Sequence, residues 1–231
     1  MTTCFTSLRL RLPLTGPMPL EATFSGMALI FTMDGIGEDE SRALLEAEGV
    51  PTDKPIVVVS VRNWKDMDKF IGKFAQMCDT IVEKYDRNIV FIGMQMPHDI
   101  TVSEKVRAKM KQNAYILKNN HSPYEVMGII SQADFILSMR LHTLIFAARK
   151  CVPLIGFVYD PKIEYYLEKL DMPSGGSLKE FDPAKTLEYV DDVIGNKASY
   201  VEKLAQKEKE LEKMAHRNEK YLAKLLERVK K

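Results

Sequence analysis

Short apolar runs and amphipathic segments alternate along this chain from residue 38 to residue 195. Continuous apolar or β-branched runs predict buried strands over 56–61, 88–94, 114–117, 135–138 and 152–158. Between these runs, apolar side chains recur every three or four residues. That spacing predicts helices over 41–48, 64–82, 103–112, 122–130 and 141–150, and a further helix that begins at Pro183. The alternation is typical of an α/β fold, a doubly wound, Rossmann-like parallel sheet of about five strands with right-handed crossovers.

The two ends of the chain have patterns of their own. Proline, glycine and threonine interrupt the apolar pieces of residues 1–36, so we expect an irregular N-terminal segment there. Residues 37–195 then form the α/β domain, and residues 196–231 form a long C-terminal helix. The apolar stripe of that helix includes Leu204 and Leu211 but is interrupted by polar residues, which argues against a long autonomous coiled coil.

Composition and charge exclude several classes of protein. The chain has 231 residues, of which 45% are hydrophobic and 28% charged, and its formal net charge is +1. Such a balance gives no reason to expect nucleic acid or an anionic membrane as a partner. The sequence has no apolar stretch long enough to span a bilayer, so we expect no transmembrane segment. The three cysteines lie far apart, without metal-ligand or redox-motif spacing, which favours a reducing, cytoplasmic compartment.

Several familiar catalytic and cofactor motifs are missing from the sequence. It has no His-Glu-x-x-His, no paired cysteine ligands and no Gly-x-Ser-x-Gly, so we expect no metal and no nucleophile elbow. Gly-x-Gly-x-x-Gly is absent as well, which weakens a dinucleotide reading, and we expect no cofactor. The loop at 174–177, with sequence SGGS, could wrap a phosphate but lacks the ending of a P-loop, and we interpret it as a linker.

The strongest candidate site lies where the strand over 135–138 gives way to a helix. Arg140 and His142 fall at this junction, and a helix start supplies unpaired N–H groups and a partial positive charge. Arg62 directly follows the strand over 56–61, and parallel strands all end at one edge of the sheet. Two guanidinium groups and a histidine on that edge suit a phosphate or carboxylate ligand. The alternatives are that Arg140 caps the sheet edge, that a backbone carbonyl satisfies His142, and that Arg62 is a helix-flanking residue in solvent.

Other polar residues follow strands on the same edge. His98 and Asp99 come after the strand over 88–94 and could form an acid–base pair, although a turn before a helix favours the same residue types. Lys162 follows the strand over 152–158 and could reach an anion, although the preceding Asp160-Pro161 is a common way to begin a helix.

At these residues the chain resembles the bacterial polysaccharide pyruvyl transferases that modify cell-wall polymers anchoring S-layer proteins. The matching elements, in order, are VSVRNW at 59–64, MQ at 94–95 with HD at 98–99, SMRLH at 138–142, VPLIG at 152–156 and YDPK at 159–162. The resemblance covers roughly residues 40–225, and the Arg-Leu-His element is its most specific part.

The resemblance implies a fold and a reaction. Members of the family resemble two-domain glycosyltransferases of the B type, in which a cleft separates two Rossmann-like halves, and this chain would correspond to the C-terminal, donor-binding half. It implies phosphoenolpyruvate as donor, and a pyruvate ketal formed on a hexosamine such as N-acetylmannosamine. Carried over by position, Arg62, Arg140, Leu141 and His142 would hold the donor. His142 would either protonate the donor or hydrogen-bond its phosphate, and a positioned acid typically contributes about 10²–10⁴-fold to a rate.

Three readings of the sequence therefore compete. In the first, the chain is the donor half of a pyruvyl transferase, and a missing N-terminal half or another chain supplies the acceptor side. The last helix of B-type glycosyltransferases often packs on that missing half, so this resemblance implies that the apolar stripe of the C-terminal helix is exposed or available to a partner. In the second, it is half of a sugar-nucleotide glycosyltransferase, which a Glu-x(7)-Glu pattern would favour. In the third, it is a non-catalytic interaction module that uses its C-terminal helix. The third reading predicts that Arg140 and His142 lie in structural pairs away from any cleft.

Overall fold

The computed structural model describes residues 30, 33–65, 67–177 and 181–229, with side chains described as far as residue 213. Six parallel strands form one sheet in the order β3-β2-β1-β4-β5-β6. The strands are β1 (Ile56–Ser60), β2 (Asn88–Phe91), β3 (Ala114–Ile116), β4 (Ala133–Ser138), β5 (Leu154–Val158) and β6 (Ser174–Ser177). The sheet confirms the predicted α/β, Rossmann-like fold. The predicted irregular segment over 1–36 lies almost entirely outside the described residues.

The sixth strand corrects the sequence interpretation, because the segment expected to be a linker is the edge strand β6. Ser174 and Ser177 pair with Gly156 and Val158 of β5. A side chain at Gly175 would meet the ring of Phe157, since a Cβ there would lie 2.6 Å from Phe157 Cε1. The glycine therefore allows the strand to pack closely on an aromatic ring, and a segment of serine and glycine gives no apolar signal of this role.

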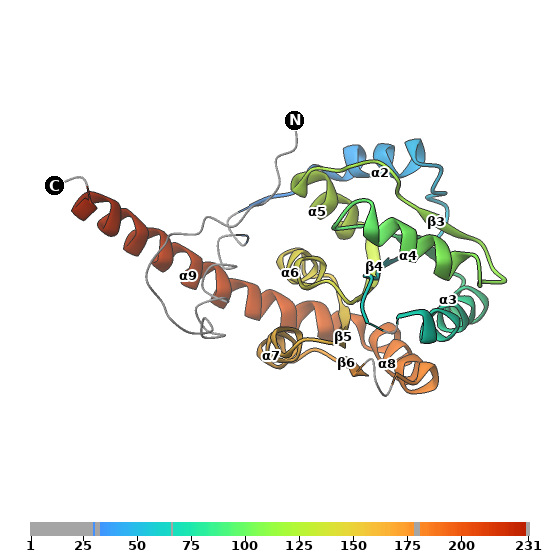
Figure 1. Cartoon of the computed structure of the whole chain (residues 1–231). Helices are drawn as coiled ribbons and strands as arrows, with labels where there is room; N and C mark the ends of the chain where they lie inside the picture. Colours follow the sequence, from blue (N-terminus) through green and yellow to red (C-terminus); the bar gives the residue numbers. More distant parts are fainter. Residues whose placement is uncertain (1–29, 31–32, 66, 178–180, 230–231) are drawn as a thin grey trace.

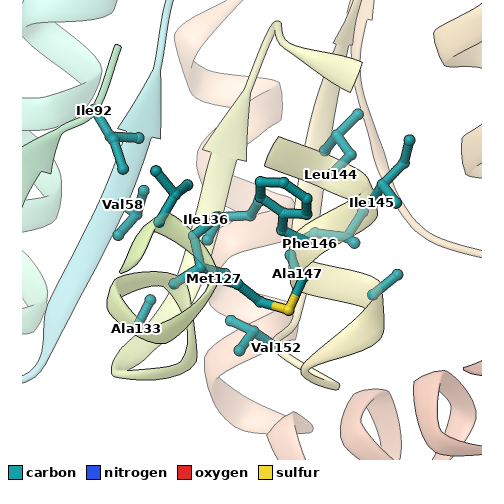
Figure 2. Close-up of a cluster of buried hydrophobic side chains, with 14 of the residues drawn as sticks. Val58, Ile92, Met127, Ala133, Ile136, Leu144, Ile145, Phe146, Ala147 and Val152 are labelled. Carbon is teal, nitrogen blue, oxygen red and sulfur yellow. The ribbon is translucent and has the colours of Figure 1, made fainter. Parts of the chain in front are cut away.

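Helices cover both faces of the sheet (Figure 1). They are α2 (Glu38–Ala47), α3 (Ile71–Tyr85), α4 (His98–Arg107), α5 (Pro123–Ser131), α6 (Leu141–Arg149), α7 (Pro161–Leu170), α8 (Pro183–Gly195) and α9 (Lys197–Val229). One face packs against α5, α6, α7 and the first part of α9, and the other against α3, α4 and α8. Alternate strand residues supply the two cores, so Val58 lies in the first and Val57 in the second. Figure 2 shows the first core, where Val58 and Ile136 of the central strands meet Met127 and Phe146.

Three helices begin elsewhere than the sequence pattern predicts, and the first of them, α2, starts at Glu38 rather than at residue 41. The segment from Trp64 is a loop with one 3₁₀ turn, Met67–Lys69, and α3 starts at Ile71 rather than at residue 64. Helix α4 spans 98–107 rather than 103–112, because the Asp99 carboxylate accepts backbone hydrogen bonds from the preceding loop and fixes an early start. The apolar periodicity cannot report a helix boundary set by such a buried polar group.

Helix α9 packs on the domain, which corrects the expectation of an exposed stripe for the part with described side chains. Leu204 and Leu211 are buried in the core shared with α6 and α7. Between them, Glu208 forms an ion pair with Arg149 of α6, with 2.5 Å between the charged atoms. Glu208, which interrupts the apolar stripe, therefore attaches α9 to α6. Helix α9 then continues beyond α7, away from the sheet (Figure 1). None of the described helices is both long and apolar enough to cross a membrane.

Substitution of Gly128 by alanine is expected to destabilise the fold by about 1–3 kcal/mol. Gly128 lies inside α5, where a methyl group would overlap the side chains of Ile36 and Ser41. Gly72 of α3 is the matched control, since a methyl group there meets nothing within 4 Å. Its replacement by alanine should change stability by less than about 1 kcal/mol, in the stabilising direction. Urea unfolding of the two variants measures the difference, and equal effects would contradict the proposed close approach.

Candidate functional site

The site lies at the topological switch point of the sheet, between β1 and β4. From β1 the sheet continues through β2 and β3, and from β4 through β5 and β6, so the connections after the two central strands diverge. Ser60 and Ser138, the last residues of these strands, are register partners. Arg62 and Arg140 each lie two residues farther on, so they occupy matched positions at the carboxyl edge.

Arg140 is held by a polar network of three elements. It is the N-cap residue of α6, and Ser138 Oγ accepts from its backbone N–H at 2.9 Å and donates to its carbonyl at 3.0 Å. Its guanidinium donates to Gln95 Oε1 at 3.1 Å and forms a short ion pair with the Asp99 carboxylate. The buried Nε has no hydrogen-bond partner among the described residues.

Asp99 is a fully buried carboxylate, and its contacts are all structural. Beyond the ion pair with Arg140, it accepts hydrogen bonds from the backbone N–H groups of Met94 at 3.0 Å and Gln95 at 2.9 Å. These contacts fix the loop after β2 and direct the guanidinium along the sheet edge. The structure thus brings Asp99 and Arg140 together, and these contacts engage both oxygens of the Asp99 carboxylate.

Arg62 is held by aromatic rings. Its guanidinium donates to the Tyr159 hydroxyl at 2.5 Å, and its Cζ lies 4.8 Å from the Tyr159 ring centroid and 5.1 Å from that of Trp64. The two rings pack on each other with centroids 4.6 Å apart. Both arrangements are favourable for a cation. Tyr159 and Trp64 lie in the matching elements of the sequence, but the sequence does not predict their contact with Arg62. Their positions just after predicted strands are the signal that could have placed them at this edge.

His142 is the second residue of α6, and its side chain is exposed at the sheet edge. The surrounding protein still desolvates the ring enough to lower its pKa below the usual 6.5, and the Arg140 guanidinium lowers it further. The free protein therefore holds His142 mainly neutral at pH 7. The preceding Leu141 is half-buried and packs against the core under α6.

His98 and Lys162 lie on the same edge but are apart from the arginine network. His98 is the first residue of α4 and Lys162 the second of α7, and both side chains are exposed. Neither side chain makes a hydrogen bond or ion pair with the described part of the chain. The backbone N–H of Lys162 donates to Asp160 Oδ1 at 2.9 Å, which confirms that Asp160-Pro161 begins a helix.

No group of three or more His, Cys, Asp or Glu side chains among the described residues is arranged to hold a metal ion. The groups available at this edge are guanidinium, imidazole, hydroxyl and backbone N–H. All of them can donate hydrogen bonds to oxyanions. The edge is therefore suited to bind an anion directly through the protein.

A family model described as "Polysaccharide pyruvyl transferase" matches residues 30–161, more than half of the chain, including both arginines and His142. A search of curated proteins finds no match.

Solved structures share the fold at low sequence identity. A glycosyltransferase from Rickettsia africae has a TM-score of 0.54 and 13% identity, covering 85% of this chain and 50% of its own. The UDP-GlcNAc 2-epimerase of Methanocaldococcus jannaschii, in complex with UDP-GlcNAc and UDP, has a TM-score of 0.53 and 17% identity, covering 76% and 46%. The C-terminal domain of a group 1 glycosyltransferase from Francisella tularensis has a TM-score of 0.52 and 15% identity, covering 80% and 94%. This chain therefore spans about half the length of the first two and nearly all of the isolated C-terminal domain.

Proposed function

Because this chain belongs to the polysaccharide pyruvyl transferase family, we propose that the edge between β1 and β4 binds phosphoenolpyruvate, the donor of a pyruvate ketal. The acceptor is a sugar of a cell-wall polysaccharide, such as the N-acetylmannosamine of polymers that anchor S-layer proteins. The observation that carries the proposal is the matched placement of Arg62 and Arg140 two residues beyond paired strand ends.

The charges of the edge fit this donor. Phosphoenolpyruvate has a phosphate and a carboxylate at a fixed separation, and two guanidinium groups can each receive one of them. Asp99 neutralises part of the charge of Arg140, whereas Arg62 has no ion pair with a described carboxylate. The first-turn N–H groups of α6, with Leu141 and His142, add donors beside Arg140.

The reaction follows from the donor's chemistry. The methylene carbon of phosphoenolpyruvate accepts a proton, which makes the neighbouring carbon electrophilic. One sugar hydroxyl adds to that carbon, and a second displaces the phosphate, so two C–O bonds to the sugar form and the C–O bond to phosphate breaks. The two hydroxyl protons end on the new methyl group and on the departing phosphate. Arg62 and Arg140 orient the donor and stabilise the charge that develops on phosphate.

The polar side chains around the arginines take different roles in this proposal. His142 lies two residues after Arg140 in the first turn of α6, where it acts on the donor as the acid or as a hydrogen-bond donor to phosphate. Asp99 acts on the donor through Arg140, which it positions, rather than by contact. The exposed His98 and Lys162 reach the ligand from α4 and α7.

A donor-binding domain over residues 37–195, with the helix of 196–231 at its end, is the second part of the proposal. This chain covers nearly all of the isolated C-terminal domain of the Francisella glycosyltransferase, which supports this part of the proposal. The match also spans only about half of the Rickettsia glycosyltransferase and of the Methanocaldococcus epimerase. The acceptor side of the cleft would then come from a further N-terminal half or from another chain.

The proposal is tested with the sole tryptophan of the sequence, Trp64, which lies against Arg62 at the edge. Titration of the purified chain with phosphoenolpyruvate should change its tryptophan fluorescence in a saturable way. UDP-GlcNAc is titrated in parallel to test the glycosyltransferase alternative. Pyruvate, which has the carboxylate but no phosphate, is the control. Saturation by UDP-GlcNAc alone would favour a sugar-nucleotide glycosyltransferase, and no response to either ligand, confirmed by calorimetry, would refute a donor half.

Donor binding is expected to draw a proton onto His142. An anion beside the ring stabilises its charged form and raises the pKa that burial and Arg140 lower in the free protein. A pKa that is higher in the complex means that affinity rises as the pH falls from 8 towards 6. Calorimetry at pH 7 in two buffers of different ionisation heat measures the proton uptake.

His142→Gln is the matched variant for this experiment. It keeps a hydrogen-bond donor but cannot take up the proton, so its uptake should fall to that of the ligand's own phosphate. Equal uptake by the variant and the wild-type chain would remove His142 from the donor site.

A further inference from the structure

Two buried hydroxyl groups at the switch point make no hydrogen bond with the part of the chain that the structure describes. Eight polar or charged residues are buried among the described residues, namely Ser41, Ser60, Asp79, Asp99, Ser103, Ser138, Thr143 and Thr186. Six of them make side-chain hydrogen bonds. Ser60 Oγ and Thr143 Oγ1 make none with the described chain, and both residues have an exposed fraction of 0%. A buried polar group without a partner is unfavourable, so each such case calls for an explanation.

Both hydroxyl groups lie on the same face of the sheet. Side chains alternate along a strand, so Ser60 shares the face of Val58, which packs against α5 and α6. Its register partner Ser138 faces the same way, and its hydroxyl is already engaged by the backbone of Arg140. At paired strand ends, one serine thus builds the start of α6 and the other is left without a partner.

Thr143 lies in the first turn of α6, which covers this face. Side chains of a helix lean back towards its N-terminus, which places Thr143 on the side of its turn nearer the carboxyl edge. Threonine inside a helix commonly donates to a carbonyl one turn earlier, but here the Arg140 carbonyl accepts from Ser138 and Thr143 has no such bond. Arg140 Nε, at the start of the same helix, is a further buried donor without a partner among the described residues.

We infer that Ser60 and Thr143 form, with the first turn of α6 and Arg140 Nε, a subsite for the phosphate of the donor. The inference rests on the proposed function and adds two residues that the family resemblance does not supply. A phosphate needs several donors from different directions. The turn of α6 offers N–H groups without intrahelical partners, and its N-cap residue makes no side-chain cap. The two hydroxyl groups complete the set from the side of the sheet.

The test compares two buried threonines. The hydroxyl of Thr143 has no partner among the described residues, whereas that of Thr186 is hydrogen-bonded. Thr143→Val removes a hydroxyl without a partner, so the variant should unfold at the same urea concentration as the wild-type chain or a higher one. It should bind phosphoenolpyruvate and inorganic phosphate at least about tenfold more weakly, as for the loss of a hydrogen bond to a charged group. Ser60→Ala should do the same. Thr186→Val is the matched control. It removes a hydroxyl bonded to the Asp182 carbonyl at 3.1 Å, so it should lower stability and leave affinity unchanged.

The outcomes separate this inference from the proposed function. If wild-type chain binds phosphoenolpyruvate and both hydroxyl variants bind it equally well, the subsite is refuted and the donor site stands. If only one variant is weakened, the other residue is removed from the subsite. If wild-type chain does not bind phosphoenolpyruvate, the proposed function fails. In that case, the subsite would still be supported if the wild-type chain binds inorganic phosphate and Thr143→Val does not. It would be refuted if the wild-type chain does not bind inorganic phosphate.

Discussion

Substitution of Arg140 by alanine is expected to weaken phosphoenolpyruvate binding by roughly 100-fold or more. Each charge-assisted hydrogen bond contributes about 1.5–3 kcal/mol, and a guanidinium that clamps an anion makes two of them. The structure directs this guanidinium along the sheet edge through Asp99 and Gln95. Isothermal calorimetry with the purified variant measures the loss.

The Arg140→Ala variant will also lose stability, so its binding must be compared with that of a second variant. Without Arg140 the carboxylate of Asp99 is left buried and unpaired, which costs about 3–5 kcal/mol. The double variant Arg140→Ala/Asp99→Asn removes that charge, so it should regain stability while still failing to bind.

Arg149→Ala provides the charge-matched control on the same helix. Arg149 ends α6 and pairs with Glu208 and Asp34, away from the carboxyl edge. Its loss should lower stability and leave donor affinity within about threefold of the wild-type value, well under 1 kcal/mol. A similar loss of affinity in both single variants would mean that stability, and not the site, controls binding.

Replacement of Asp99 by alanine is expected to lower the free energy of unfolding by about 3–5 kcal/mol. The substitution leaves the backbone N–H groups of Met94 and Gln95 without their acceptor, and the Arg140 guanidinium without its counter-charge. Because this buried pair joins β2, α4 and α6, its loss loosens the edge as well as the core.

Asp79→Ala isolates the contribution of the ion pair. Asp79 is also a buried aspartate that accepts backbone hydrogen bonds, from Lys111 and Gln112, but it has no ion pair with a described residue. Its loss should cost about 1–2 kcal/mol, like the loss of a helix cap. Urea unfolding compares the two variants, and equal costs would show that the Asp99–Arg140 pair adds nothing to stability.

The sequence predicts the elements of this fold better than their ends. Continuous apolar runs such as that of β1 can be buried in few ways, so the strands and their parallel arrangement follow from the pattern. The start of α4 does not, because it depends on the buried Asp99 carboxylate and the backbone N–H groups of the loop before it, and apolar spacing carries no signal of such contacts. Strand β6 carries no apolar signal, since its glycine is fitted to the ring of Phe157.

The candidate site, too, is predictable from the sequence only in part. The common edge of Arg62 and Arg140 follows from topology alone, and the register of Ser60 with Ser138 confirms it. The partners of those side chains could not be predicted. Tyr159 meets Arg62 across a separation of 97 residues, and Asp99 meets Arg140 across 41. Whether a histidine or an aspartate at an edge faces solvent or supports a neighbour depends on such contacts.

Helix α6 is anchored by charge at both of its ends. At one end Arg140 pairs with Asp99, and at the other Arg149 binds the Met33 carbonyl, Asp34 and Glu208 of α9. Nine residues of helix amount to a rod of about 14 Å. The segment at Met33 and Asp34 and helix α9 are thus fastened to the same end of α6. Both attachments therefore lie at one end of α6, and the edge proposed to bind the donor lies about 14 Å away at its other end.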